Sequence, residues 1–80
     1  MTIANDGSTL GDALRPLEQR LLDERPARVV LTDDSDTALA AALVAAKLGI
    51  TVEPRPAASD APSTNGQLIA QLAGTYTHAP

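Results

Sequence analysis

Residues 27–52, ARVVLTDDSDTALAAALVAAKLGITV, decide the fold of this chain. An apolar strand over Arg28–Thr32 is followed by an acidic turn and an alanine-rich helix over about Thr37–Leu48. Gly49 supplies the stop that helices favour at their carboxyl end, and a second apolar strand begins at Ile50–Val52. Strand, helix and strand in this order predict one βαβ unit of a parallel sheet.

The same segment predicts how the strands pair. A right-handed crossover should place Val29–Leu31 beside Ile50–Val52 in parallel, with the intervening helix packed over both. The first strand has three consecutive apolar residues, which is typical of a strand buried on both faces. We expect four apolar residues of the helix and second strand to be among the most buried, namely Leu39, Leu43, Ala46 and Ile50.

A helix should precede this unit over Leu10–Glu24, because leucines recur there at helical spacing. Thr9 and Asp12 have the spacing of a capping box. Pro16 conflicts with a continuous helix, since proline in a helix interior removes a hydrogen bond. The helix should therefore kink at Pro16 or begin there, and Pro26 should end it.

A short third helix should follow a loop over Ala57–Thr64. Thr64 and Gln67 have the spacing of a cap, and Gly74 should end the helix. We therefore expect a disordered amino terminus over residues 1–8 and a single small α/β domain over residues 9–80. Its fold class is a βαβ fragment of a Rossmann-like parallel sheet, preceded by one helix and followed by a short one. Two parallel strands leave open edges, so the chain resembles a piece of a larger sheet.

Composition excludes several classes of function. The chain has 80 residues, a net charge of −4, no cysteine and a single lysine, so it lacks the clustered cations of a nucleic-acid-binding protein. Its longest apolar run, Ala38–Ala46, is far shorter than the roughly 20 residues of a membrane span. Lack of cysteine and of a signal-peptide pattern fits a cytoplasmic protein. With Tyr76 as its sole aromatic residue, the core should be thin.

Three acids, Asp33, Asp34 and Asp36, stand where the first strand meets the helix. In open α/β sheets this carboxyl end of a strand is where ligands bind. Helix capping accounts for one aspartate, but three in four positions repel each other. A magnesium site and a general acid or base remain as alternatives. His78, the only histidine, is expected to be a solvated residue near the carboxyl end of the chain.

From about Leu10 to Pro80 the chain resembles the N-terminal domain of the non-hydrolysing UDP-N-acetylglucosamine 2-epimerases. Those proteins have a helix, a strand, a Gly-Asp-Thr motif, a Leu-Ala-rich helix and Gly-Ile-Pro-Val. Matching residues agree in order and spacing: Pro26, Val29, Val30, Asp34, Thr37, Leu39, Ala40, Ala41, Leu43, Ala45, Ala46, Lys47, Leu48, Gly49, Ile50 and Val52. Asp33 stands where the family has glycine.

Later family motifs are largely missing. His-x-Glu-Ala-Gly-Leu-Arg falls on residues 54–60, where only Ala57 agrees, and Asn65 matches the asparagine of Glu-Glu-x-Asn-Arg. The resemblance implies Asp34 as a catalytic residue, and Asp36, Thr37 and Asn65 as substrate-binding residues, with neither metal nor cofactor. It also implies nucleotide-sugar isomerisation, UDP-GlcNAc to UDP-ManNAc. The family's second, UDP-binding domain is absent, so we expect no activity from the chain alone.

Two other interpretations stay open. The segment VVLTDDSDTALAAAL also resembles the first strand and helix of a response-regulator receiver, in which an acidic pair binds magnesium. Alternatively, the chain is a non-catalytic interaction module. In each case we expect a protein partner or a homo-oligomer, and a UDP-sugar would bind only with a partner domain.

Overall fold

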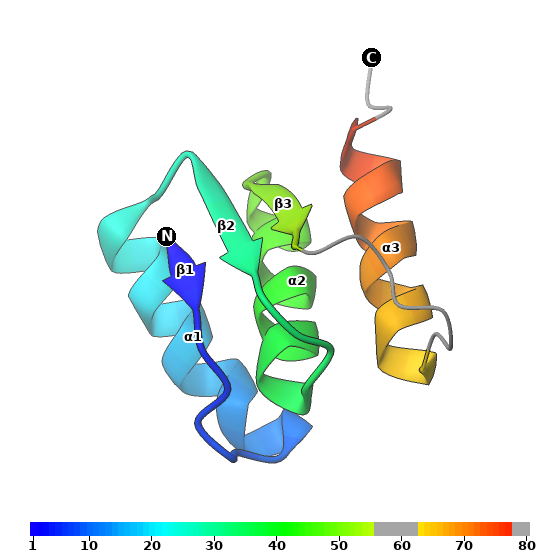
Figure 1. Ribbon diagram of the computed structural model, residues 1–80. Coiled ribbons are helices and arrows are strands. Elements are labelled where there is room, and N and C mark those ends of the chain that lie inside the picture. The colour runs from blue at the N-terminus through cyan, green and yellow to red at the C-terminus, as the bar shows by residue number, and fades with distance from the viewer. Residues whose placement is uncertain (56–62, 78–80) are drawn as a thin grey trace.

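The structure, a computed structural model, describes residues 1–55 and 63–77, with the backbone alone for residues 74–77. Three strands alternate with three helices along the chain (Figure 1). In order they are β1 (Thr2–Ile3), α1 (Leu10–Glu24), β2 (Arg28–Leu31), α2 (Asp36–Leu48), β3 (Thr51–Pro54) and α3 (Thr64–Thr77).

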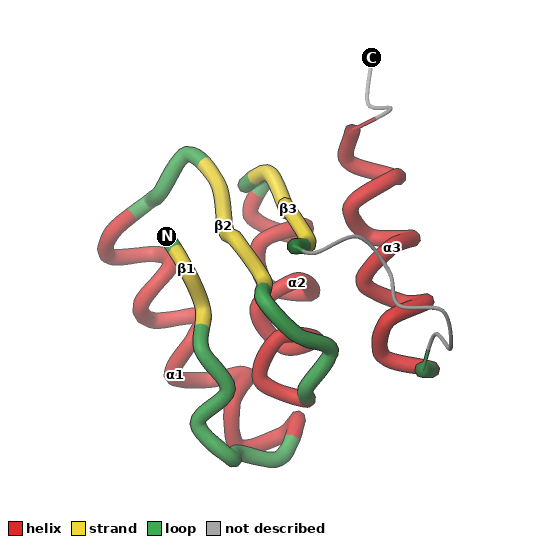
Figure 2. The backbone as a smooth tube through the Cα atoms, in the orientation of Figure 1, coloured by secondary structure: helices red, strands yellow, loops and turns green. Residues whose placement is uncertain are grey.

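The strands form one parallel sheet in the order β1-β2-β3 (Figure 2). Val29 of β2 lies opposite Val52 of β3, which confirms the predicted parallel βαβ unit. β1 was not expected, because residues 1–8 were predicted to be disordered. Thr2 instead pairs with Val30, and the side chain of Ile3 is buried. A strand of two residues is too short to show the alternating pattern by which a strand is recognised.

The helices lie on one side of the sheet. Strand order runs in one direction, so right-handed crossovers place α1 and α2 over the same face. α3 packs beside α2 and β3 (Figure 1). The extents of 35 × 34 × 17 Å agree with a flat molecule of two layers. Val30 of β2 is only half-buried, so this strand is not buried on both faces as predicted.

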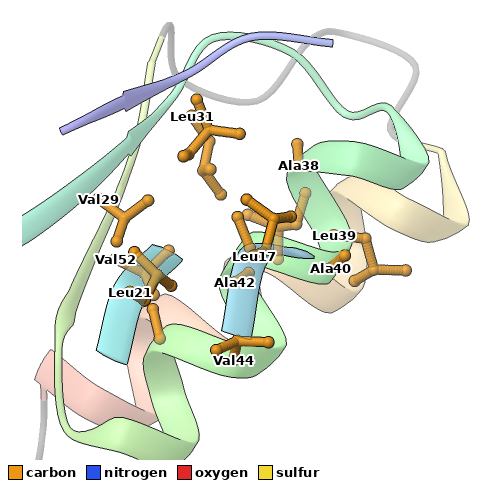
Figure 3. Packing of buried hydrophobic residues seen from close by; sticks show 14 of the residues in the cluster. Leu17, Leu21, Val29, Leu31, Ala38, Leu39, Ala40, Ala42, Val44 and Val52 are labelled. Carbon is orange, nitrogen blue, oxygen red and sulfur yellow. The ribbon is translucent and has the colours of Figure 1, made fainter. Parts of the chain in front are cut away.

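The core lies between the sheet and the helix layer (Figure 3). Leu21 of α1 and Val29 of β2 are fully buried there. Leu39 and Ile50 are buried as predicted. Leu43 and Ala46 are only half-buried, so that part of the prediction is wrong. The reason is that α2 turns its alanines toward the rest of the molecule. Five of them are 2% exposed or less: Ala38, Ala40, Ala41, Ala42 and Ala45.

The helix ends differ in part from the prediction. α1 begins at Leu10, with the Thr9 hydroxyl accepting from the Asp12 amide, and runs through Pro16, which is exposed. α3 continues past Gly74, so that glycine does not end it. A glycine can remain inside a helix at a modest cost in free energy, so its presence marks an end only where the backbone turns left-handed.

Candidate functional site

Three connections meet at the carboxyl edge of the sheet, where a ligand of an open α/β fold would bind. They are residues 4–9 after β1, residues 32–35 after β2, and Ser63 before α3. Figure 2 shows the first two in green, at the same end of the strands. The polar side chains at this edge belong mostly to these connections or to the first turn of the helix that follows.

The connection after β1 is built from two side chains that bond to the backbone two residues ahead. Asn5 Oδ1 accepts from the Gly7 amide at 2.8 Å, and Asp6 Oδ1 accepts from the Ser8 amide at 2.9 Å. Thr37, which is buried in the first turn of α2, donates its hydroxyl to Asp6 Oδ1 at 3.0 Å. Hydrogen bonds from Ser8, and then from Thr37, lower the pKa of Asp6.

Sequence reasoning missed Asn5 and Asp6 because it treated residues 1–8 as disordered. A signal was nevertheless present. Asn-Asp-Gly-Ser is a run of turn-forming residues, and Asn and Asp favour this position because they bond to nearby backbone amides. Placed between a short apolar segment and a helix, such a run predicts an ordered turn.

The acidic turn after β2 is capped by a serine. Ser35 Oγ accepts from the Ala38 amide at 3.2 Å, so Ser35 is the N-cap of α2 and none of the three aspartates is. Asp33 Oδ1 accepts from the Ser35 amide at 2.9 Å. Asp36 is the first residue of α2, where a negative charge interacts favourably with the helix dipole. Capping is therefore one part of what this turn does.

The rest of the turn contacts the start of α3. Ser63 donates its hydroxyl to Asp34 Oδ2. Asn65 Nδ2 donates to the Asp34 carbonyl at 3.0 Å and to Asp36 Oδ1 at 2.9 Å. We call Asp34, Asp36, Ser63 and Asn65 the α3 cluster. These bonds join two segments about 30 residues apart and give each of the two carboxylates a neutral donor.

Ser63 caps α3, where Thr64 was predicted. Its Oγ accepts from the Gly66 amide at 2.9 Å while its hydrogen goes to Asp34. A methyl group at Gly66 would lie 3.3 Å from Ser63 Oγ and 3.7 Å from Asp34 Oδ2. The glycine thus leaves room for the serine and the carboxylate to approach the first turn of α3.

The residues singled out in the sequence lie at this one edge. Asp34, Asp36 and Asn65 are in direct contact. Thr37 sits apart from them, with its hydroxyl directed at Asp6. Most of the segment matched to the His-x-Glu-Ala-Gly-Leu-Arg motif, residues 56–60, lies outside the described residues, as does His78.

Metal chemistry gains no support from this geometry. Over residues 1–55 and 63–77 no group of three or more Asp, Glu, His or Cys side chains is arranged to hold an ion. Hard cations such as magnesium are held by several oxygen ligands at once. The aspartate side chains at this edge bond instead to hydroxyls and amides of the same chain.

Within the part of the chain that the structure describes, no helix combines the length and apolar character needed to cross a bilayer.

Comparison with known proteins gave no match to any family model, any curated protein or any solved structure. The resemblance to the epimerase family therefore rests on the quoted residues alone.

Proposed function

We propose that this chain is a non-catalytic α/β interaction module that acts as part of a larger assembly. The observation that supports it is the α3 cluster. Asp34 and Asp36 bond to Ser63 and Asn65, and so hold α3 against the turn. Hydrogen bonds to charged acceptors are stronger than neutral ones and offset the repulsion among neighbouring carboxylates. The acids thus have a structural task that requires no ligand.

The open edges and the uncovered face of the sheet also support the proposal of a partner. β1 and β3 are its edge strands, and the helices pack on one of its faces. On the opposite face, Thr51 and Arg28 are exposed and Glu53 is half-buried. Parallel sheets are normally covered on both faces, and open strand edges invite pairing with another chain. A cytoplasmic location, inferred from composition, stays part of this proposal.

Replacing the acids tests the structural role. Asp34→Ala and Asp36→Ala should lower the unfolding free energy by about 1 kcal/mol each, because Ser63 and Asn65 lose their acceptors. Amide exchange in α3 should rise more than in α2. The matched control is Asp23→Ala in α1, which removes the same charge at an exposed position and should change stability by at most about 0.5 kcal/mol.

The opposite sign would overturn the proposal. Carboxylates gathered for binding or catalysis repel each other, so their replacement often stabilises a protein at the expense of activity. If Asp34→Ala or Asp36→Ala raised the melting temperature above that of Asp23→Ala, the acids would be assigned to a ligand.

A second candidate is a nucleotide-sugar role inherited from the epimerase family. It is favoured by one observation: Asp34, Asp36 and Asn65, which the resemblance marks as site residues, lie together at the ligand-binding edge of the sheet. In this case the UDP-sugar binds only together with a UDP-binding partner domain. The chain alone performs no isomerisation.

Two measurements test this candidate. Purified chain incubated with UDP-GlcNAc should release neither UDP-ManNAc nor UDP. Turnover by the wild-type chain that disappears in Asp34→Asn would instead show that the chain is an enzyme. A titration with UDP-GlcNAc, followed by amide NMR, should shift Asp34 and Asn65 only when the partner domain is added. Shifts at these residues in the chain alone would contradict the requirement for a partner.

A further inference from the structure

A groove runs between α1 and α2, away from the carboxyl edge of the sheet. Its volume is about 520 Å³, and it is lined entirely by residues of these two helices. Its apolar floor consists of Leu14, Leu43, Val44 and Leu48. Leu43 is one of the residues that the sequence predicted to be buried and that the structure leaves half-exposed. The groove therefore presents aliphatic side chains that the fold itself does not cover.

Charged residues of both signs border this floor. Arg15 and Glu18 of α1 and Lys47 of α2 line the groove and are exposed. Within residues 1–55 and 63–77, the ion pairs are Arg20–Glu24, Arg28–Glu53 and Arg55–Glu53. The three groove charges therefore have no ion-pair partner in the described part of the chain. They stay available to a partner that carries matching charges.

We propose that a second copy of this chain covers the groove, in a two-fold dimer that packs α1 and α2 of each copy against the same helices of the other. This inference rests on the proposed function, and it adds a contact on the helix layer to the one argued above for the open sheet. In a two-fold interface the same patch meets itself, so a patch of one sign would repel its copy. Here Glu18 of one copy can face Arg15 or Lys47 of the other.

The apolar strip extends beyond the groove. Leu22, which is 43% exposed, follows Glu18 by four residues and so lies on the same side of α1. A stable interface buries roughly 800 Å² on each partner, about a sixth of the 4968 Å² that this chain exposes. The outer sides of both helices, including Leu22, would be needed to supply that area.

The groove does not share the negative charge of the chain as a whole. The chain carries a net charge of −4, which makes two copies repel each other at long range. The charged side chains that line the groove are two cations and one anion, so a contact there adds no excess of negative charge.

The test is the mass of the full chain, measured by sedimentation equilibrium from low micromolar to millimolar concentration. We expect the mass to rise from 8.2 kDa toward twice that value. Leu43→Glu should weaken the dimer by roughly tenfold or more, because it places a charge on the apolar floor. The matched control is Leu68→Glu on α3, which changes a leucine that is 41% exposed and lies outside the groove.

Charge reversals keep the test valid if Leu43→Glu fails to fold, because they change exposed residues. Glu18→Lys should weaken the dimer, and adding Lys47→Glu should restore it. A wild-type chain that stays monomeric at millimolar concentration would overturn the dimer. So would dissociation by Leu68→Glu together with an intact dimer in Leu43→Glu. These outcomes are separate from the melting temperatures of the Asp34 and Asp36 variants, which test the interaction-module proposal.

Discussion

The body of the molecule, residues 1–55, and helix α3 are held in place by different forces. The body contributes nearly all of the buried apolar residues, from α1, α2 and all three strands. Among the described side chains of α3, Ile69 is the one that is buried. The partly buried Leu72 and Ala73 also pack against the core, and the α3 cluster attaches the start of the helix. Burial thus fixes the body, whereas one buried side chain, two partly buried ones and a few hydrogen bonds fix α3.

This difference sets an order of stability. Regions with few buried apolar contacts open at lower free energy than the core that they cover. α3 should therefore detach from the body before the sheet and the other two helices unfold. If a partner acts on the chain by displacing one helix, α3 should require the least free energy to move.

The largest expected effect separates two neighbouring leucines of the body. Leu21 is fully buried, whereas Leu22 is 43% exposed. Leu21→Ala should lower the unfolding free energy by about 2–5 kcal/mol, because it removes buried apolar surface and leaves a cavity. Leu22→Ala should change it by no more than about 0.5 kcal/mol in the monomer. Urea denaturation at low protein concentration measures both. Equal losses from the two variants would contradict the core assignment.

A second prediction concerns the apolar anchor of α3. Ile69 is 3% exposed, so Ile69→Ala should lower the free energy of opening α3 by about 2 kcal/mol or more. Because α3 can detach on its own, the loss should appear in the amide exchange of α3 and leave α2 nearly unchanged. The exposed neighbour provides the control, since Leu68→Ala should leave both helices protected. Equal loss of protection in α2 and α3 would show that the two regions unfold as one.

Sequence reasoning succeeded in the body because the signals there are strong and local. The valine-rich strand, the alanine-rich helix and Gly49 predicted β2, α2 and the end of that helix. Gly49 adopts φ 76°, the left-handed conformation expected of a glycine at this position. Burial of Leu43 and Ala46 was mispredicted, because periodicity cannot show which side of a nearly all-apolar helix faces outward.

The candidate site was only partly predictable. The place of Asp34 and Asp36 at the carboxyl end of β2 followed from the predicted end of the strand and start of the helix. Their contacts with Ser63 and Asn65 join residues far apart in the chain, so no local pattern shows them. Asp6 was missed because β1 has only two residues, and its connection was therefore taken as disordered.

A smaller effect compares glycines in the first turns of α1 and α3. A methyl group at Gly11 would meet no atom within 4 Å, whereas one at Gly66 would lie 3.3 Å from Ser63 Oγ. Gly11→Ala should stabilise the protein by about 0.4–1 kcal/mol, because alanine restricts the unfolded chain. Gly66→Ala should gain less or lose stability, since the methyl group crowds the α3 cluster. Thermal unfolding of both variants measures which one is more stable. A larger gain in stability for Gly66→Ala than for Gly11→Ala would contradict the close approach of Ser63 Oγ to position 66.

The smallest effect concerns a single carboxyl group in the connection after β1. Hydrogen bonds from Ser8, followed by the one from Thr37, lower the pKa of Asp6. A carboxyl group whose pKa is lower in the folded than in the unfolded state favours folding at pH values above its ordinary pKa of 3.8. That contribution disappears as the pH falls through the lower, folded-state pKa. Asp6→Asn should therefore flatten the pH dependence of stability in the acidic range below about pH 4.

Carboxyl NMR titration of the folded protein can rank the causes of this shift. Ser8→Ala keeps the backbone amide bond but removes the side-chain bond, which is the largest cause of the shift, so it should return the pKa of Asp6 toward its ordinary value by more than Thr37→Val does. A larger change of the Asp6 pKa in Thr37→Val would mean that the hydrogen bond from α2, rather than the bonds of the local turn, is the main cause of the lowered pKa. The charge state of Asp6 would then depend on α2, just as the position of α3 depends on the acidic turn.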